Sequence, residues 1–71
     1  MDTNIESHLH SANRLLIELQ MEHADLDAIV DRLAHAIPLD ELMLQRMKKR
    51  RLALRDHITS LERQLDPQEP A

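Results

Sequence analysis

The sequence predicts an all-α protein: an antiparallel, coiled-coil-like two-helix hairpin that assembles into a dimeric four-helix bundle or a larger oligomer. One reason is composition. The chain has no Gly, Cys, Phe, Tyr or Trp, so its 42% of hydrophobic residues are Leu, Ile, Ala, Met and Val, which favours helix and gives strands almost no support. The other reason is a largely apolar repeat at alternating spacings of three and four, interrupted at Pro38, as in helices that pack along one face.

The small size of the chain predicts self-association. A chain of 71 residues buries little surface unless a covalent staple or a second copy supplements its core. Disulfides cannot supply the staple because cysteine is absent. We therefore expect a second copy of the chain as a partner.

The first helix is predicted at about residues 12–36. Residues 1–11 are an N-terminal segment that can form a short helix, because Thr3 and Glu6 have the spacing of a capping box. The main helix ends before Pro38, since proline lacks an amide hydrogen and restricts the residue before it.

A turn near residues 37–39 leads into a second helix at about 40–65. Pro38 can serve as the first residue of this helix, with Asp40 and Glu41 in its first turn, where the helix dipole favours negative charge. The hairpin as a whole covers residues 12–66. Residues 67–71, PQEPA, have the composition of a disordered tail.

The repeat defines one contact face between the two helices, which we call the seam. With the turn at Pro38, each seam residue of the first helix faces a seam residue of the second. Two of the seam residues are polar. His23 is expected to be a packed, hydrogen-bonded residue that fixes register, and Arg51 to cover Leu26 with its stem while its guanidinium reaches an edge or a carboxylate. Beside the seam, Asp27 is expected to face Lys48. The seam consists of Leu16, Leu19, His23, Leu26, Val30, Leu33, Leu44, Met47, Arg51, Leu54, Ile58 and Leu61.

Two segments carry a family resemblance: EHADLDAIVDRL in the first helix and DELMLQRMKKRRLALRDHI in the second. They resemble the YdcH family of small bacterial proteins, whose pattern is H-x-x-L-D-x-x-I followed by K-K-x-[KR]-L-x-L-K-D-x-I. The resemblance covers about residues 18–62, with Val30 and Arg55 where Ile and Lys are usual. It implies a helical hairpin that self-associates and a family without an established biochemical activity. The positions in register are His23, Leu26, Asp27, Val30, Lys48, Lys49, Arg51, Leu52, Leu54, Asp56 and Ile58.

Six of the nine Lys and Arg residues lie within residues 46–55, and we call them the basic surface. Three interpretations remain open: a solvated face balanced by the acidic first helix, a docking surface for an acidic protein, or a surface for nucleic-acid phosphates. A formal net charge of −4 and the absence of aromatic residues count against nucleic acid. The basic surface consists of Arg46, Lys48, Lys49, Arg50, Arg51 and Arg55.

A second set of small and apolar residues lies opposite the seam, and we call it the stripe. If the stripe is used, the first helices of two or more hairpins pack at the centre of the oligomer, with the basic helices outside. Two alternatives remain: the alanines are only good helix formers on a wet surface, or dimerisation uses the seam face, which Leu15 and Ile29 widen. The stripe consists of Ile17, Met21, Ala24 and Ala28.

Nothing in the sequence predicts catalysis, a cofactor, a metal site or a small-molecule substrate. His23, His35 and His57 have no histidine three or four residues away, as a metal site on one helix needs. No apolar run is long enough for a membrane span, and the acidic N-terminus is unlike a signal peptide, so we expect a cytoplasmic protein without membrane association. The predicted function is a small, non-enzymatic protein-interaction module that self-associates and presents the basic surface to a protein partner. The alternative is a nucleic-acid-associated protein that uses residues 46–55.

Overall fold

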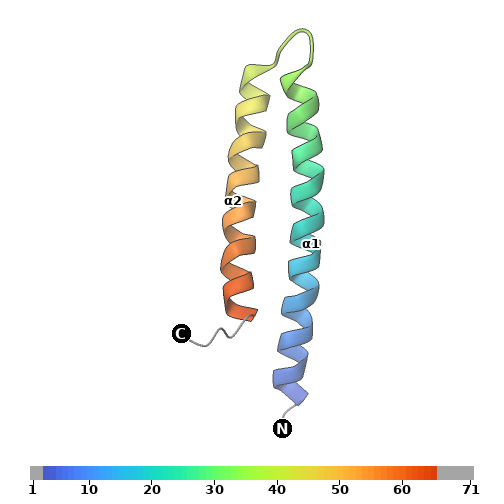
Figure 1. Ribbon diagram of the computed structural model, residues 1–71, viewed down its shortest axis with the longest axis vertical. Coiled ribbons are helices and arrows are strands. Elements are labelled where there is room, and N and C mark those ends of the chain that lie inside the picture. The colour runs from blue at the N-terminus through green and yellow to red at the C-terminus, as the bar shows by residue number, and fades with distance from the viewer. Residues whose placement is uncertain (1–2, 66–71) are drawn as a thin grey trace.

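The chain folds into two helices that run antiparallel, side by side (Figure 1). The computed structural model describes the backbone of residues 3–65 and the side chains of residues 10–65. Helix α1 spans Thr3–Ala34 and helix α2 spans Glu41–Leu65, and within this described part there is no strand. The predicted all-α hairpin is thereby confirmed. Its dimensions of 57 × 28 × 14 Å are those of a rod, one helix thick.

Helix α1 begins earlier than expected. It is continuous over 32 residues from Thr3, so the expected boundary between residues 11 and 12 lies inside it. The helix crosses this boundary because no glycine or proline interrupts it and the three-four spacing continues through Ala12. The part of residues 1–11 that the structure describes is therefore the first turns of α1. The predicted tail, residues 67–71, lies outside the described residues.

The connection between the helices spans residues 35–40, which makes it longer than the predicted turn. Helix α1 ends at Ala34, and the last turn tightens as the N–H groups of His35 and Ala36 donate to the carbonyls three residues before them, at 3.2 and 3.3 Å. Pro38 lies within this connection and is not the first residue of α2 as expected.

Asp40 is the N-cap of α2. Its Oδ1 accepts the backbone N–H of Met43 at 3.0 Å, which satisfies one of the donors that a helix start leaves without an intrahelical partner. Helix α2 therefore begins at Glu41, one residue later than predicted.

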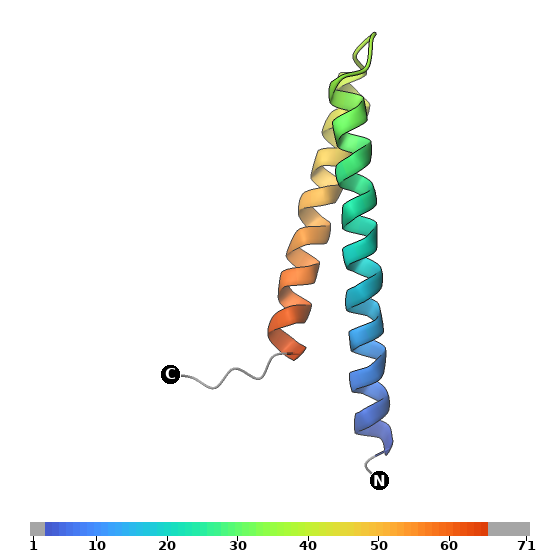
Figure 2. The same cartoon turned by 45° about the vertical axis from the view of Figure 1, so that its right-hand side comes forward.

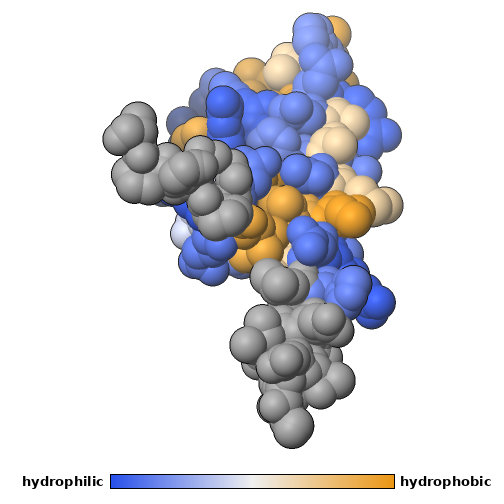
Figure 3. Space-filling model, turned by 60° about the horizontal axis from the view of Figure 1, so that its bottom comes forward, coloured by the Kyte–Doolittle hydropathy of each residue, from blue (hydrophilic) through white to orange (hydrophobic). Residues whose placement is uncertain are grey.

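The core lies between the two helices and is thin. Its five buried side chains are 6–9% exposed, and no described side chain is less than 2% exposed. Part of the core is a cluster toward the ends opposite the turn, where apolar side chains reach the surface between the helices (Figure 3). A hairpin built in this way leaves most of each helix uncovered. The five buried residues are Leu19, Leu26, Val30, Ile58 and Leu61.

The two helices end at different levels. Ala12 of α1 and Leu65, the last residue of α2, pack against the same cluster. The turns of α1 that precede Ala12 therefore extend beyond α2, as Figure 2 shows.

Candidate interaction surfaces

All twelve residues of the seam are buried or half-buried. Among the described side chains, three others share this property: Ala12, Ile29 and Leu65. Alternating spacings of three and four keep such residues on one face of a helix. The contact between α1 and α2 thus follows this face.

Arg51 links the helices across the seam. It is 31% exposed, and its Nη1 donates to Oδ1 of Asp27 at 2.7 Å. Asp27 therefore engages Arg51 and not Lys48 as expected. Lys48 precedes Arg51 by three residues and lies roughly 60° further around α2, whereas the long arginine stem carries its head from the seam to the edge.

A second ion pair lies on the opposite edge of the seam. Nη2 of Arg50 is 3.9 Å from Oε2 of Glu22, and both side chains are more than half exposed. Glu22 and Asp27 are five residues apart and so project roughly 140° apart around α1. The two ion pairs therefore lie on either side of the seam. Pairs with this exposure add little to the stability of the hairpin, and their main effect is on the register between the helices.

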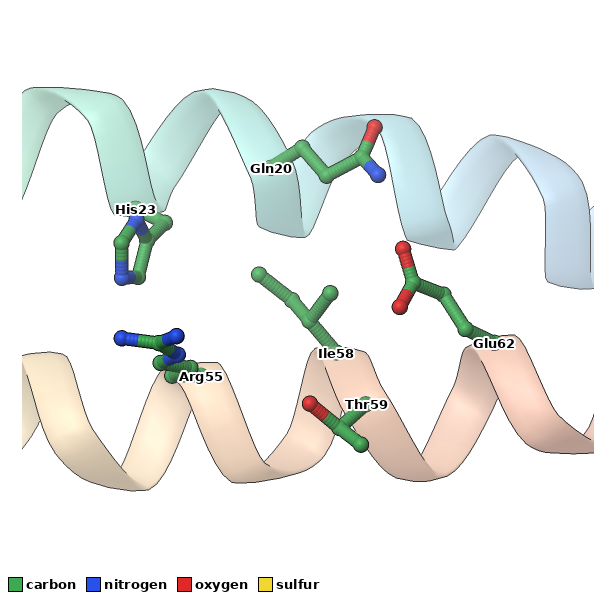
Figure 4. A pocket seen from close by; sticks show the side chains of 6 residues that line it. All are labelled: Gln20, His23, Arg55, Ile58, Thr59 and Glu62. Carbon is green, nitrogen blue, oxygen red and sulfur yellow. The ribbon is translucent and has the colours of Figure 1, made fainter.

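His23 lies in a shallow pocket of about 360 Å³ between the helices. Its half-buried ring points toward the guanidinium of Arg55, while Glu62 points from α2 toward α1 (Figure 4). Within the hairpin no hydrogen bond joins the ring to another described residue, and a hydrogen bond of His23 in an assembled bundle stays a prediction. The lining residues are Gln20, His23, Arg55, Ile58, Thr59 and Glu62.

The pocket combines charged and polar side chains with one apolar side chain, Ile58. Among the described side chains of residues 10–65, no three of His, Asp or Glu are grouped to hold a metal ion. The pocket is a groove between the two helices that is open to solvent, so water reaches the polar groups that line it. Sites that bind small molecules are usually concave and mostly apolar.

The six residues of the basic surface do not form one face. They project in different directions around α2, because consecutive residues are about 100° apart, and Arg50 and Arg51 are engaged by carboxylates of α1. Lys48 and Lys49 lie four and three residues before Leu52, which is 60% exposed, so all three share one side of the helix. We call Lys48, Lys49 and Leu52 the outer patch.

The stripe is uncovered in the hairpin. Ile17 is 58% and Met21 64% exposed, and both alanines are exposed as well. Helix α2 packs on the other side of α1, and no described residue packs on the stripe. Two sizeable apolar side chains on a charged helix are thus open to water.

The tip of the hairpin is apolar, and sequence reasoning missed it. Ile37 is 96% exposed, and Leu39 and Leu42 are also large exposed apolar residues. The available signal was their position around Pro38. Ile37 continues the seam spacing four residues after Leu33, but helix α1 ends before it, and Leu39 and Leu42 fall outside that spacing.

These surfaces define a class of protein: a small two-helix hairpin with exposed apolar and charged surfaces. Neither described helix is long and apolar enough to cross a membrane. A family described as "Protein of unknown function (DUF465)" matches residues 16–62, more than half of the chain. The chain therefore belongs to the DUF465 family, which is the YdcH-like family that its motifs predicted. No curated protein and no solved structure matches the chain.

Proposed function

We propose that the protein is a small, non-enzymatic interaction module of the cytoplasm that self-associates through helix packing and presents a basic surface to an acidic protein partner. One observation carries the proposal. The hairpin leaves exposed both the stripe on α1 and the outer patch on α2.

The outer patch suits a partner that is both apolar and acidic. Leu52 offers an apolar anchor, and the two lysines beside it offer mobile positive charges at neighbouring positions. An amphipathic helix with an apolar ridge flanked by Asp and Glu would match both features. Packing along the seam holds α2 against α1, and the ion pairs of Arg50 and Arg51 define the register, so the outer patch faces outward.

The thin core supports self-association. Every buried residue keeps some contact with water, and small domains without disulfides or metals gain stability from oligomerisation. Shallow, solvent-facing pockets support a role in binding rather than catalysis.

The test compares capture of proteins by immobilised variants from an extract of the source cells. The parent chain and the control Leu42→Ser should capture the same acidic protein, since Leu42 is a similarly exposed leucine near the tip. Leu52→Ser combined with Lys49→Glu should abolish the capture. Capture that survives this double change would refute docking at the outer patch.

A parallel titration with random duplex DNA and RNA tests the nucleic-acid alternative. Phosphate binding should weaken steeply with salt and depend on each of the lysines and arginines, but not on Leu52. Docking of an acidic protein should depend on Leu52 as well. Sensitivity to Leu52→Ser therefore separates the two functions.

A further inference from the structure

The stripe has a spacing that reads the same in both directions. Ile17, Met21, Ala24 and Ala28 are separated by four, three and four residues. An antiparallel copy of α1 can therefore be placed so that position 17 faces position 28 and position 21 faces position 24. An arrangement of this kind repeats the same contact on both subunits, as a two-fold interface requires.

We infer that a second copy of this chain covers the stripe, with its α1 antiparallel and the two-fold axis level with the peptide between Glu22 and His23. This inference rests on the proposed self-association and specifies its face, direction and register. The basic α2 helices lie on the outside of such a dimer, so the outer patch stays accessible.

Side-chain size favours the antiparallel register. Ile17 meets Ala28 of the partner subunit, and Met21 meets Ala24 of the partner subunit, so each layer joins one large and one small side chain. The helices can then stay at one close separation along the contact, which preserves dense packing. A parallel pair would place the isoleucines together at one end and leave alanines facing each other at the other end.

Charge complementarity supports the same register. Arg14 precedes Ile17 by three residues and Asp31 follows Ala28 by three, so both extend the stripe by one step. The antiparallel register places Arg14 level with Asp31 of the partner subunit, at both ends of the apolar contact. A parallel pair would bring each of these charges against its own copy, which is repulsive.

One feature of the register opposes association. Glu18 comes within two residues of the level of Asp25 of the partner subunit, on one side of the stripe. This like-charge approach weakens the dimer. We therefore expect association in the micromolar range rather than tighter.

The widened seam face is the less suitable dimer contact. Leu15, Glu22 and Ile29 are spaced by seven and share one edge of α1. The carboxylate of Glu22, in its ion pair with Arg50, lies at the middle of this edge. A partner helix there would have to desolvate the ion pair, which is costly.

Introduced cysteines test direction and register directly, because the natural chain contains none. The Ile17→Cys and Ala28→Cys chains, carrying tags of different mass, are mixed and oxidised. The antiparallel register predicts that the mixed disulfide predominates over both self-disulfides. Leu52→Cys is the matched control on the outer side of α2, where no disulfide with either chain is expected.

Substitutions give an independent measurement by light scattering and sedimentation. The parent chain should be a dimer at micromolar concentration, and Ala24→Glu with Ala28→Glu should make it monomeric while its helicity is unchanged. Arg14→Glu should raise the dissociation constant about five-fold or more, since two ion pairs are lost per dimer. Adding Asp31→Arg should restore the parent value to within about two-fold.

The outcomes separate this inference from the proposal beneath it. A monomeric parent chain would overturn self-association and the dimer geometry together. A dimer that survives the two glutamates, or that forms self-disulfides through Ile17→Cys, would overturn the geometry and leave self-association standing. The mixed disulfide together with rescue by the charge swap would support the inference.

Discussion

Two residues of the seam, His23 and Arg51, are polar, and the structure treats them differently. Arg51 places its stem in the seam and its guanidinium on Asp27 at 2.7 Å, so its charge is paired at the edge. His23 is half-buried and faces Arg55 without a hydrogen-bond partner among the described residues. Arg51 therefore links the two helices, whereas His23 places a polar ring without a hydrogen-bond partner in the contact between them.

Asp27→Asn should lower the free energy of unfolding by at most about 1 kcal/mol, because a pair with this exposure is largely solvated. Lys48→Ala should change it by less than about 0.5 kcal/mol, as expected for a surface residue outside the pair. Urea unfolding measures both. The charge swap Asp27→Arg with Arg51→Asp should recover the loss, and a larger effect of Lys48→Ala than of Asp27→Asn would contradict this pairing.

His23→Leu should leave the hairpin at least as stable as the parent, and more stable by up to about 1 kcal/mol. The substitution replaces a half-buried ring beside an arginine by an apolar side chain in the same layer. His57→Leu is the control, because His57 is exposed. A loss of several kcal/mol in thermal or urea unfolding would mean that the imidazole makes a contact that the structure lacks.

Burial distinguishes leucines that have the same chemistry. Leu19 is buried and Leu52 is exposed. Leu19→Ala should therefore cost about 2–3 kcal/mol, near the lower end for buried leucines because the core is thin, and Leu52→Ala less than about 0.5 kcal/mol. Equal losses in urea unfolding would show that the outer patch is covered in solution.

At the scale of elements, the start of α2 depends on a single side chain. Asp40 accepts the N–H of Met43, and Glu41 follows it as the acidic residue of the first turn. The carboxylate both satisfies a helix donor and lies at the positive end of the helix dipole. Pro38, two residues earlier, prevents α1 from continuing through the connection. The turn therefore depends on two residues: Pro38 stops the first helix and Asp40 starts the second.

Asp40→Ala should destabilise the hairpin by about 1 kcal/mol, whereas Asp40→Asn should retain most of the stability, because asparagine caps almost as well. Amide chemical shifts of Met43 report the hydrogen bond, and thermal unfolding reports its effect. Glu41→Ala is the matched control, because it removes a negative charge from the first turn and leaves the capping hydrogen bond in place. If Glu41→Ala and Asp40→Ala lowered the stability equally, the effect of Asp40 would come from its charge near the helix dipole and not from the hydrogen bond.

At the scale of the molecule, the hairpin is a rod with a thin core and several exposed apolar surfaces. The rod is 57 Å long and 14 Å in its smallest dimension. Stability that depends on a second copy must depend on concentration, because mass action favours the folded oligomer as protein is added.

The melting temperature of the parent chain should rise by several degrees over a hundred-fold increase in concentration. Ala24→Glu should remove this dependence, because it places a charge in the proposed contact. Leu42→Glu at the tip serves as the control and should keep the dependence. A parent melting temperature that is independent of concentration would argue against self-association as a source of stability.

The two-helix fold, the position of the reversal and the residues of the contact face could be predicted from the sequence, because each depends on signals that act within a few residues. Proline stops a helix wherever it stands, and the three-four spacing defines a face whatever the partner is. The start of α1 was predicted only in part: Thr3 and Glu6 have the spacing of a capping box, but the main helix was expected to begin near residue 12, whereas α1 is continuous from Thr3.

The partner of Asp27, the exposure of the tip and the pairing of Arg50 and Arg51 with carboxylates of α1 emerged only from the tertiary structure. Which of two neighbouring basic residues reaches a carboxylate on the other helix depends on the helix separation, the axial offset and the length of each side chain. The spacing of residues in the sequence does not specify the first two. Residues such as Ile37 read as apolar in the sequence, but only the path of the chain between the helices leaves them without a surface to pack against.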